Sequence, residues 1–310
     1  MTLIKNRIIV CVFFVLTNIS LYAQQFDGIS VLSLVERIQP APESVFKKFR
    51  EAGMDPVNHS LTEGEGEAFQ KSLSLLPNSY KKVLQEHLHS FSFMDNMPNT
   101  ALTSTLDTAV HREMFNITFR AGIFQETISE WATWKENMCY KPTENGEYQL
   151  RIDAGDLNAM VYVLFHEVTH VMDVVMGVTP KADDEDSSSD FTPFTQNVWS
   201  GRNRPVETYV DSLLETTRFR GGKPISIARA SEVYSLLKKT PFVSLYGMAS
   251  WNEDLAELAT IYHLTMVLKQ PYNISVTHKG VEIFRFEPME NDLVKNRLQQ
   301  LQIFYNNGEE

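Results

Sequence analysis

The sequence predicts an α+β fold that is mainly helical, and three patterns support this. In residues 28–87 apolar side chains recur every three or four positions, the spacing of helices with one buried face. Residues 89–95 and 114–121 are rich in β-branched and aromatic residues, which favours short strands of a small sheet. Residues 156–177 and 251–268 are apolar on almost every side, as buried helices are.

The first 23 residues have the layout of a secretory signal peptide. Lys5 and Arg7 precede an apolar run at residues 8–16, and cleavage is expected after the small residue Ala23. The uncharged span is shorter than the roughly 20 residues that cross a bilayer, and no later segment is long and apolar enough to span. We therefore expect a secreted or periplasmic protein without stable membrane insertion, with an uncleaved anchor as the alternative.

The remaining chain is expected to hold two parts, an N-terminal helical region at residues 24–87 and a larger domain at residues 88–310. Loss of Lys5 and Arg7 with the leader changes the formal net charge from −11 to −13, which argues against nucleic acid as a partner. Cys139 is then the only thiol, so no intrachain disulfide forms, and we interpret it as a packed core residue. Nothing in the sequence indicates the oligomeric state.

Further elements are expected in order along the chain. A helix is predicted over residues 126–137, and a strand over residues 148–152 leads into the apolar helix at 156–177. The C-terminal part adds four elements: helices at 206–218 and 227–238, a hairpin that turns at 278–280, and a terminal helix at 289–305. The polar, acidic residues 181–190 read as a solvated loop.

His166, Glu167 and His170 form an HExxH motif within the first apolar helix. Positions four apart lie on one face of a helix, so both imidazoles can bind one metal ion while Glu167 reaches the same cleft. Zinc suits such ligands, with nitrogens at about 2.0–2.1 Å. The alternative is a helix whose histidines only hydrogen-bond to neighbours, but burying three such groups without a metal carries a desolvation cost.

A third ligand must come from elsewhere in the chain. The extended motif HExxHxxGxxH is excluded, because Asp173 and Met176 occupy its glycine and last histidine positions. Glu253 and Glu257 stand one turn apart near the start of the second apolar helix, where a buried carboxylate persists only if it is paired or bound to metal. Glu253 is therefore the expected ligand and Glu257 its support, although Ser250-x-x-Glu253 also fits a capping box.

The segments YGMASWNEDLAE and HEVTHVMD resemble the gluzincin metallopeptidases related to the Pro-Pro endopeptidases and to the catalytic domain of toxin lethal factors. The resemblance implies a zincin-like catalytic domain, in which a small mixed sheet accompanies an active-site helix and a third-ligand helix. It also implies cleavage of peptide bonds. The roles that it assigns are zinc ligation by His166, His170 and Glu253, general base for Glu167, and oxyanion donor for Tyr246.

Other polar residues have two interpretations each. Asp173, one turn after His170, either accepts the second N–H of an imidazole or is a plain surface carboxylate. Arg202 and Arg204 either bind a substrate carboxylate or belong to a surface loop, and the second is favoured. His263 is interpreted as a core or surface histidine that is not a ligand.

The sequence as a whole predicts a secreted zinc-dependent peptidase that acts on peptides or proteins. Zinc would activate a water molecule that Glu167 deprotonates, and the strand at 148–152 is the expected edge for an extended substrate. The alternative is a catalytically silent, secreted binding protein with a zincin fold. A carbohydrate-binding scaffold is disfavoured, since the four tryptophans fall in helical or loop contexts.

Overall fold

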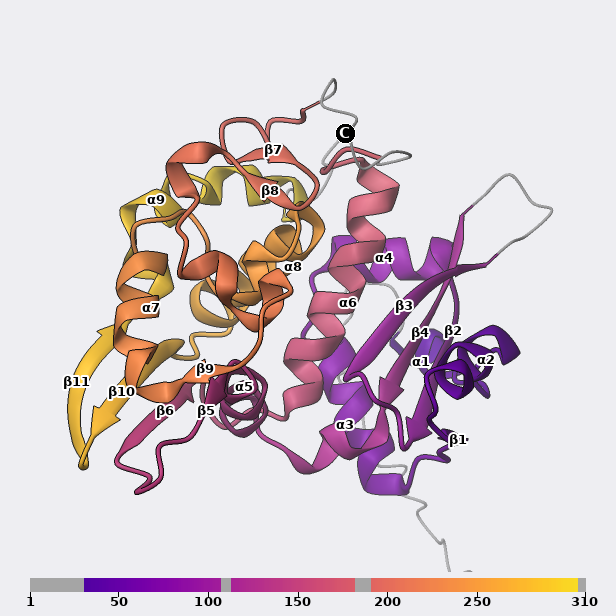
Figure 1. Ribbon diagram of the computed structural model, residues 1–310. Coiled ribbons are helices and arrows are strands. Elements are labelled where there is room, and N and C mark those ends of the chain that lie inside the picture. The colour runs from indigo at the N-terminus through magenta and orange to yellow at the C-terminus, as the bar shows by residue number, and fades with distance from the viewer. Residues whose placement is uncertain (1–30, 107–112, 182–190, 306–310) are drawn as a thin grey trace, which may run out of the picture.

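The computed structural model describes residues 31–106, 113–181 and 191–305, and it shows an α+β arrangement of helices around small sheets (Figure 1). This confirms the coarse fold class. The signal peptide predicted at residues 1–23 and nearly all of the acidic loop predicted at 181–190 lie outside the described residues.

The first sheet has the strand order β1-β2-β4-β3, so that β3 is an edge strand. Strands β2 and β4 are parallel, whereas β3 runs antiparallel to β4. The bounds are β1 Val57–Asn58, β2 Leu88–Asp95, β3 Ala101–Leu106 and β4 Met114–Arg120. Strands β2 and β4 confirm the predictions at 89–95 and 114–121, but β3 was not predicted.

Four helices precede or flank this sheet. They are α1 Val31–Val35, α2 Glu43–Glu51, α3 Glu63–Ser74 and α4 Asn78–His87. Phe69 of α3 packs edge-on against Phe91 and Phe93 of β2, with ring centroids 5.0 and 5.1 Å apart. Helices α1, α3 and α4 thus share one hydrophobic core with the rest of the chain, whereas Val45 and Phe49 of α2 pack in a smaller cluster with Met94 and Met97.

The second sheet is antiparallel, with the order β11-β10-β6. Its strands are β6 Tyr148–Asp153, β10 Asn273–His278 and β11 Val281–Phe286. The predicted hairpin is confirmed, and it turns at Lys279 and Gly280, both of which have positive φ. Helix α5, Ile128–Asn137, lies against β6 through Thr133, whose hydroxyl accepts a hydrogen bond from the Ile152 amide at 2.9 Å.

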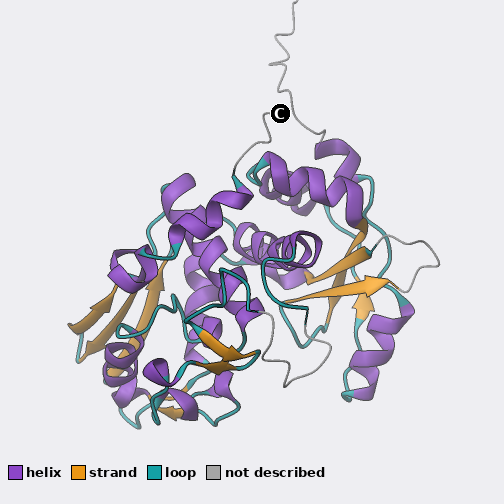
Figure 2. Ribbon diagram, turned by 90° about the horizontal axis from the view of Figure 1, so that it is seen from above, coloured by secondary structure: helices purple, strands orange, loops and turns teal. Residues whose placement is uncertain are grey.

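Helix α6, Ala159–Met176, occupies the centre of the molecule, with the first sheet on one side and the C-terminal elements on the other (Figures 1 and 2). The Asn158 side chain caps its start, and Gly177 ends it in the left-handed conformation at φ 63°. Although the sequence suggested no later segment long and apolar enough to span a bilayer, α6 alone among the described residues passes a length and hydropathy test, and 78% of that window is buried inside the protein. Such burial is what the core helix of a folded domain shows.

Helix α8, Trp251–Tyr262, packs beside α6 and continues as a π-helical segment, His263–Val267. Together they confirm the predicted buried helix at 251–268. Helix α7, Ala230–Leu237, follows a 3-10 turn at Ile227–Arg229 and confirms the prediction at 227–238. Two minor pairs complete the fold: β5 Tyr140–Lys141 with β9 Ile225–Ser226, and β7 Trp199–Gly201 with β8 Arg204–Pro205.

Two predicted helices are wrong. Residues 206–218 form separate 3-10 turns, because the Thr216 and Thr217 hydroxyls bond to carbonyls three residues back and Asp211 bonds to the Leu213 amide. The segment 289–305 is divided into α9, Asp292–Lys295, and a 3-10 helix, Leu298–Phe304. The division falls next to Arg297, whose side chain is buried against α8.

Candidate metal centre

The two histidines of the motif lie on one face of α6, as their spacing predicts. Their ring centroids are 4.9 Å apart and the rings are nearly perpendicular. His166 is 6% exposed, whereas the His170 side chain is 21% exposed, so the site is buried at one imidazole and reaches the surface at the other.

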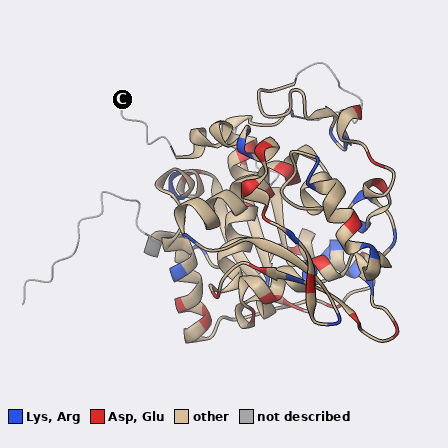
Figure 3. Cartoon of the chain, turned by 90° about the vertical axis from the view of Figure 1, so that its left-hand side faces the viewer, with Lys and Arg blue, Asp and Glu red and all other residues tan. Residues whose placement is uncertain are grey.

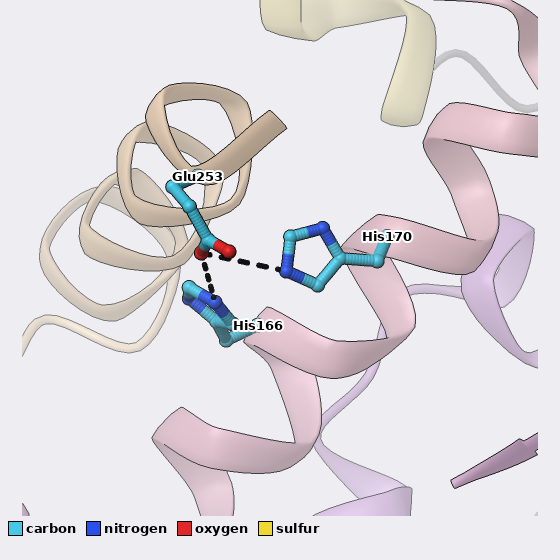
Figure 4. A group of neighbouring side chains, drawn as sticks. All are labelled: His166, His170 and Glu253. Carbon is cyan, nitrogen blue, oxygen red and sulfur yellow. Dashed lines mark hydrogen bonds and ion pairs between the residues drawn. The ribbon is translucent and has the colours of Figure 1, made fainter. Parts of the chain in front are cut away.

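Glu253 approaches this pair from α8 (Figure 4). Its Oε2 lies 3.1 Å from His166 Nε2 and 3.6 Å from His170 Nε2. One donor atom from each of the three residues falls within 4.8 Å of the other two, a group that can hold a metal ion. The predicted convergence of the late glutamate on the imidazole pair is therefore present.

Glu253 takes part in the cap of α8 through its backbone but not through its carboxylate. Its backbone N–H bonds to the Ser250 hydroxyl at 3.3 Å, so Ser250 does cap α8. The Glu253 carboxylate is directed at the imidazoles instead of back at Ser250. Only half of a capping box is formed, and the carboxylate is free to be a ligand.

Neighbouring charges raise the pKa of His166 and lower the pKa of Glu253. Burial disfavours an imidazolium, but Glu253 and Glu257 outweigh it and raise the pKa of His166 to about 9. Burial likewise opposes the Glu253 carboxylate, yet His170 and His166 hold the pKa of Glu253 well below its usual range. The two carboxylates thus favour positive charge at this position, and a metal ion that binds must displace any proton from the ligating nitrogens.

Glu257 lies behind His166 and is 1% exposed. Its Oε1 is 3.2 Å from His166 Nδ1, within ion-pair reach although not aligned as a regular hydrogen bond. Lys135 Nζ lies 3.1 Å from the same oxygen, and the Ser244 hydroxyl donates to the other at 2.6 Å. Burial would raise the pKa of Glu257, but Lys135 and His166 lower it to about 2, so the carboxylate is charged and can orient the imidazole.

Glu167 is fixed by β3, the strand that the sequence did not reveal. The Thr103 hydroxyl donates to Glu167 Oε2 at 2.7 Å. The side chain is 9% exposed, at the wall of the cavity that also contains His166 and His170. Thr103 was missed because no local pattern links a threonine in a short strand to a helix 64 residues later.

Tyr246 lies on the 3-10 turn Tyr246–Met248, just before α8. Its ring stacks on the His166 ring with centroids 5.9 Å apart, and Lys135 Nζ is 4.0 Å from the Tyr246 centroid. Burial first, and then the carboxylates of Glu253 and Glu167, raise the pKa of Tyr246. The phenol therefore keeps its proton and can donate a hydrogen bond into the site.

Asp173 does not orient an imidazole, contrary to one of its two interpretations, and it is not a surface carboxylate either. It is buried, and its oxygens accept bonds from the Thr179 amide and hydroxyl, both at 2.7 Å. A third bond comes from the Asn252 side-chain amide at 2.9 Å. Because Asn252 precedes Glu253, Asp173 ties the end of α6 to the ligand-bearing turn of α8.

Two cavities border the candidate metal site. One of 390 Å³ is lined by His166, Glu167 and Tyr246 together with an aromatic wall that includes Trp131 and Trp134. The other, of 430 Å³, shares those three site residues and also contains His170, Glu253 and Arg202. Residues 99 and 101 line both cavities, so the start of β3 runs past the site. No residue of β6 lines either one, so the strand at 148–152, which the sequence suggested as the substrate edge, does not border these two cavities.

The remaining candidates lie away from the site. His263 is buried, bonds through its ring nitrogens to the Leu75 carbonyl and the Tyr305 hydroxyl, and stacks on Phe165. Burial lowers its pKa to about 4, as expected for a core histidine. Cys139 is 1% exposed, and burial raises its thiol pKa, which agrees with a packed residue.

Compared with known proteins, the chain matches no family model, no curated protein and no solved structure.

Proposed function

We propose that the protein is an exported zinc-dependent peptidase with a zincin-like catalytic domain. The observation that supports this most is the convergence of His166, His170 and Glu253 within 4.8 Å, with the unligated acid Glu167 on the same cavity wall. Export rests on the leader sequence, and the gluzincin assignment rests on the motif resemblance.

Zinc is the proposed ion because of the donor set. Two imidazole nitrogens and one carboxylate oxygen are the ligands of many catalytic zinc sites, which keep a fourth position open. When bound there, zinc would lower the pKa of a water molecule to near 7 and polarise a carbonyl group.

The chain's own residues supply the proton transfers and the positioning. Glu167 would take a proton from the attacking water and deliver it to the leaving amine, and Thr103 holds its carboxylate in place. Tyr246, kept as a phenol, would donate a hydrogen bond to the oxyanion that develops on the substrate. Glu257 would keep His166 in a fixed orientation.

A peptide is the proposed substrate because of β3. This strand ends the sheet, so one of its edges is open to pairing, and its residues line both cavities of the site. An extended peptide can add to such an edge through main-chain hydrogen bonds, which brings a backbone carbonyl past the metal site.

The direct test is Glu167→Gln in zinc-loaded protein. The amide cannot act as a base, so peptide cleavage should fall by at least about a hundredfold while zinc stays bound. Cut sites in a mixed peptide pool are read by mass spectrometry, and zinc is measured by elemental analysis. Cleavage that survives the substitution would remove Glu167 as the base. Zinc binding without cleavage by the unmodified protein would instead favour the silent binding protein.

A further inference from the structure

Arg202 lies at the tip of the β7–β8 hairpin, next to the metal site. Its backbone carbonyl accepts a hydrogen bond from the Trp251 amide at 3.0 Å, two residues before the ligand Glu253. Arg202 lines the 430 Å³ cavity that contains His170 and Glu253. It also lines a second cavity of 960 Å³, which is bordered by the residues of the hairpin. The hairpin is thus anchored to α8 through its backbone, which leaves the side chain available.

The Arg202 guanidinium has no hydrogen bond or ion pair with any of the residues that the structure describes. Other arginines nearby are engaged: Arg220 bonds to Glu215 and to the Met248 carbonyl, and Arg297 bonds to Asp254. A planar guanidinium with open donors binds a carboxylate in a charge-assisted, often bidentate, geometry.

The acids of the same cavity do not compete for Arg202. Glu167 is held by Thr103, Asp173 by Thr179 and Asn252, and Glu253 by the two imidazoles. The chain as a whole is acidic, and basic and acidic residues are intermixed on the face drawn in Figure 3. Arg202 is exposed at the cavity wall, and its guanidinium, which pairs with none of the described residues, is therefore open to an anionic group supplied from outside.

The direction in which β3 runs determines which part of a paired substrate peptide would lie next to Arg202. Ala101 at the start of β3 lines both cavities, whereas Thr103 and Thr105 line only the one that contains Arg202, so β3 runs toward Arg202. Antiparallel pairing is the more stable arrangement, and an antiparallel peptide runs the opposite way. Its residues before the scissile bond would then lie on the Arg202 side.

We infer that Arg202 binds the carboxylate of an aspartate or glutamate on the N-terminal side of the scissile bond, which makes acidic peptides the preferred substrates. This inference rests on the proposed peptidase function. The charge of Arg202 would select the substrate by pairing with it, while a neutral residue would leave the guanidinium solvated.

Two peptides that differ only by Glu or Gln before the cut site test this, once cut sites are known from a mixed pool. The unmodified, zinc-loaded protein should give a kcat/KM about tenfold higher for the Glu peptide, the size of one charge-assisted hydrogen bond. Arg202→Ala should bring the ratio of the two kcat/KM values close to one, and Arg202→Glu should reverse it.

Arg204→Glu is the matched control, because Arg204 is on the same hairpin but lines only the 960 Å³ cavity. It should keep the preference.

A binding measurement separates this inference from the peptidase proposal. Zinc-loaded Glu167→Gln protein should bind the Glu peptide about tenfold more tightly than the Gln peptide by calorimetry, and adding Arg202→Ala should abolish the difference. Equal binding and equal cleavage of the two peptides would overturn the role of Arg202 and leave the peptidase standing. A preference for acid after the cut, or one that Arg202→Ala does not change, would also overturn it. Selective binding without any cleavage would retain Arg202 and reject the peptidase.

Discussion

At the scale of single residues, the three candidate metal ligands could be predicted because polar side chains are unusual in apolar helices. His166, His170 and Glu253 are polar side chains in apolar helices, and burial there demands a partner. Thr103 and Lys135 could not be predicted in the same way. Each is an ordinary residue in its own segment, and its role arises only when the fold brings it to Glu167 or Glu257.

Asp173 is a residue for which the spacing along the helix suggested the wrong hydrogen-bond partner. It stands one turn from His170, the right interval for a bond to that ring. The chain turns back after Gly177 and brings Thr179 to the carboxylate, and a backbone amide and hydroxyl satisfy it instead. The spacing of apolar residues, from which the helix was predicted, does not indicate such a turn.

Tyr246→Phe tests the proposed oxyanion donor. The substitution removes the hydroxyl but keeps the ring that stacks on His166, so zinc content should not change. Loss of one such donor costs about a hundredfold in kcat or more, roughly 3 kcal/mol in the transition state. Steady-state kinetics on one peptide with zinc analysis of the same sample is the measurement. Turnover equal to that of the unmodified protein would mean that Tyr246 only packs.

Glu136 of α5 gives a prediction of pH dependence. The side chain is 3% exposed and accepts a hydrogen bond from Tyr234, and burial raises its pKa to about 7. The folded state thus holds this proton more tightly than the unfolded state, whose pKa is 4.5. The contribution of Glu136 to stability is therefore lost as pH rises from near 4.5 through about 7.

Glu136→Gln should remove this pH dependence, because the amide stays neutral and can still accept the Tyr234 bond. The gain in the free energy of unfolding should be larger at about pH 8 than at about pH 5, by on the order of 2 kcal/mol. Urea unfolding at the two pH values measures it. An equal effect of the substitution at both would show that Glu136 is not protonated preferentially in the folded protein.

At the scale of elements, long and strongly patterned segments were predictable and short ones were not. Helices α6 and α8 followed from nearly continuous apolar runs, and β2, β4 and the β10–β11 hairpin followed from strand composition and a glycine turn. Strand β3 has four hydroxyl or small residues in six, so its composition does not distinguish it from a loop. It forms because β4 offers it an edge.

The placement of α8 also depends on a buried ion pair at Asp254, the residue after Glu253. Asp254, which is fully buried, accepts two bonds from Arg297 at 2.9 and 2.6 Å and one from the Trp199 indole at 2.9 Å. The C-terminal segment and the β7–β8 hairpin are thereby joined to the turn that carries Glu253. The burial of Arg297 in this ion pair explains why the helix predicted at 289–305 is interrupted next to that residue.

Arg297→Met should therefore destabilise the fold strongly. It leaves the Asp254 carboxylate buried with one donor, which costs about 3–5 kcal/mol in the free energy of unfolding. The double variant Arg297→Met with Asp254→Asn should recover part of the loss, because the unpaired charge is gone. Both are measured by urea unfolding of metal-free protein. A loss of less than about 1 kcal/mol for the single variant would show that the pair is dispensable.

At the scale of the whole molecule, the two ligand-bearing helices belong to different halves of the fold. Helix α6 packs against the first sheet and the N-terminal helices, whereas α8 is joined to the C-terminal segments (Figure 1). The site forms only where these halves meet, and their separation in sequence is why no single motif contains it. A bound ion would link them by coordination in addition to packing.

Metal addition should consequently stabilise the whole protein and not only the loops around the site. An ion that binds only the folded state adds about 4 kcal/mol when its free concentration is a thousand times its dissociation constant. Thermal unfolding of chelator-treated protein, with and without added zinc, measures this gain as a rise in Tm. In Glu253→Ala protein, which lacks the carboxylate from α8, the rise should be much smaller, because the two imidazoles of α6 would bind the ion without help from the other half. An equal rise in both proteins would show that Glu253 does not contribute to the metal site, and that the close approach of α8 to the imidazole pair serves packing alone.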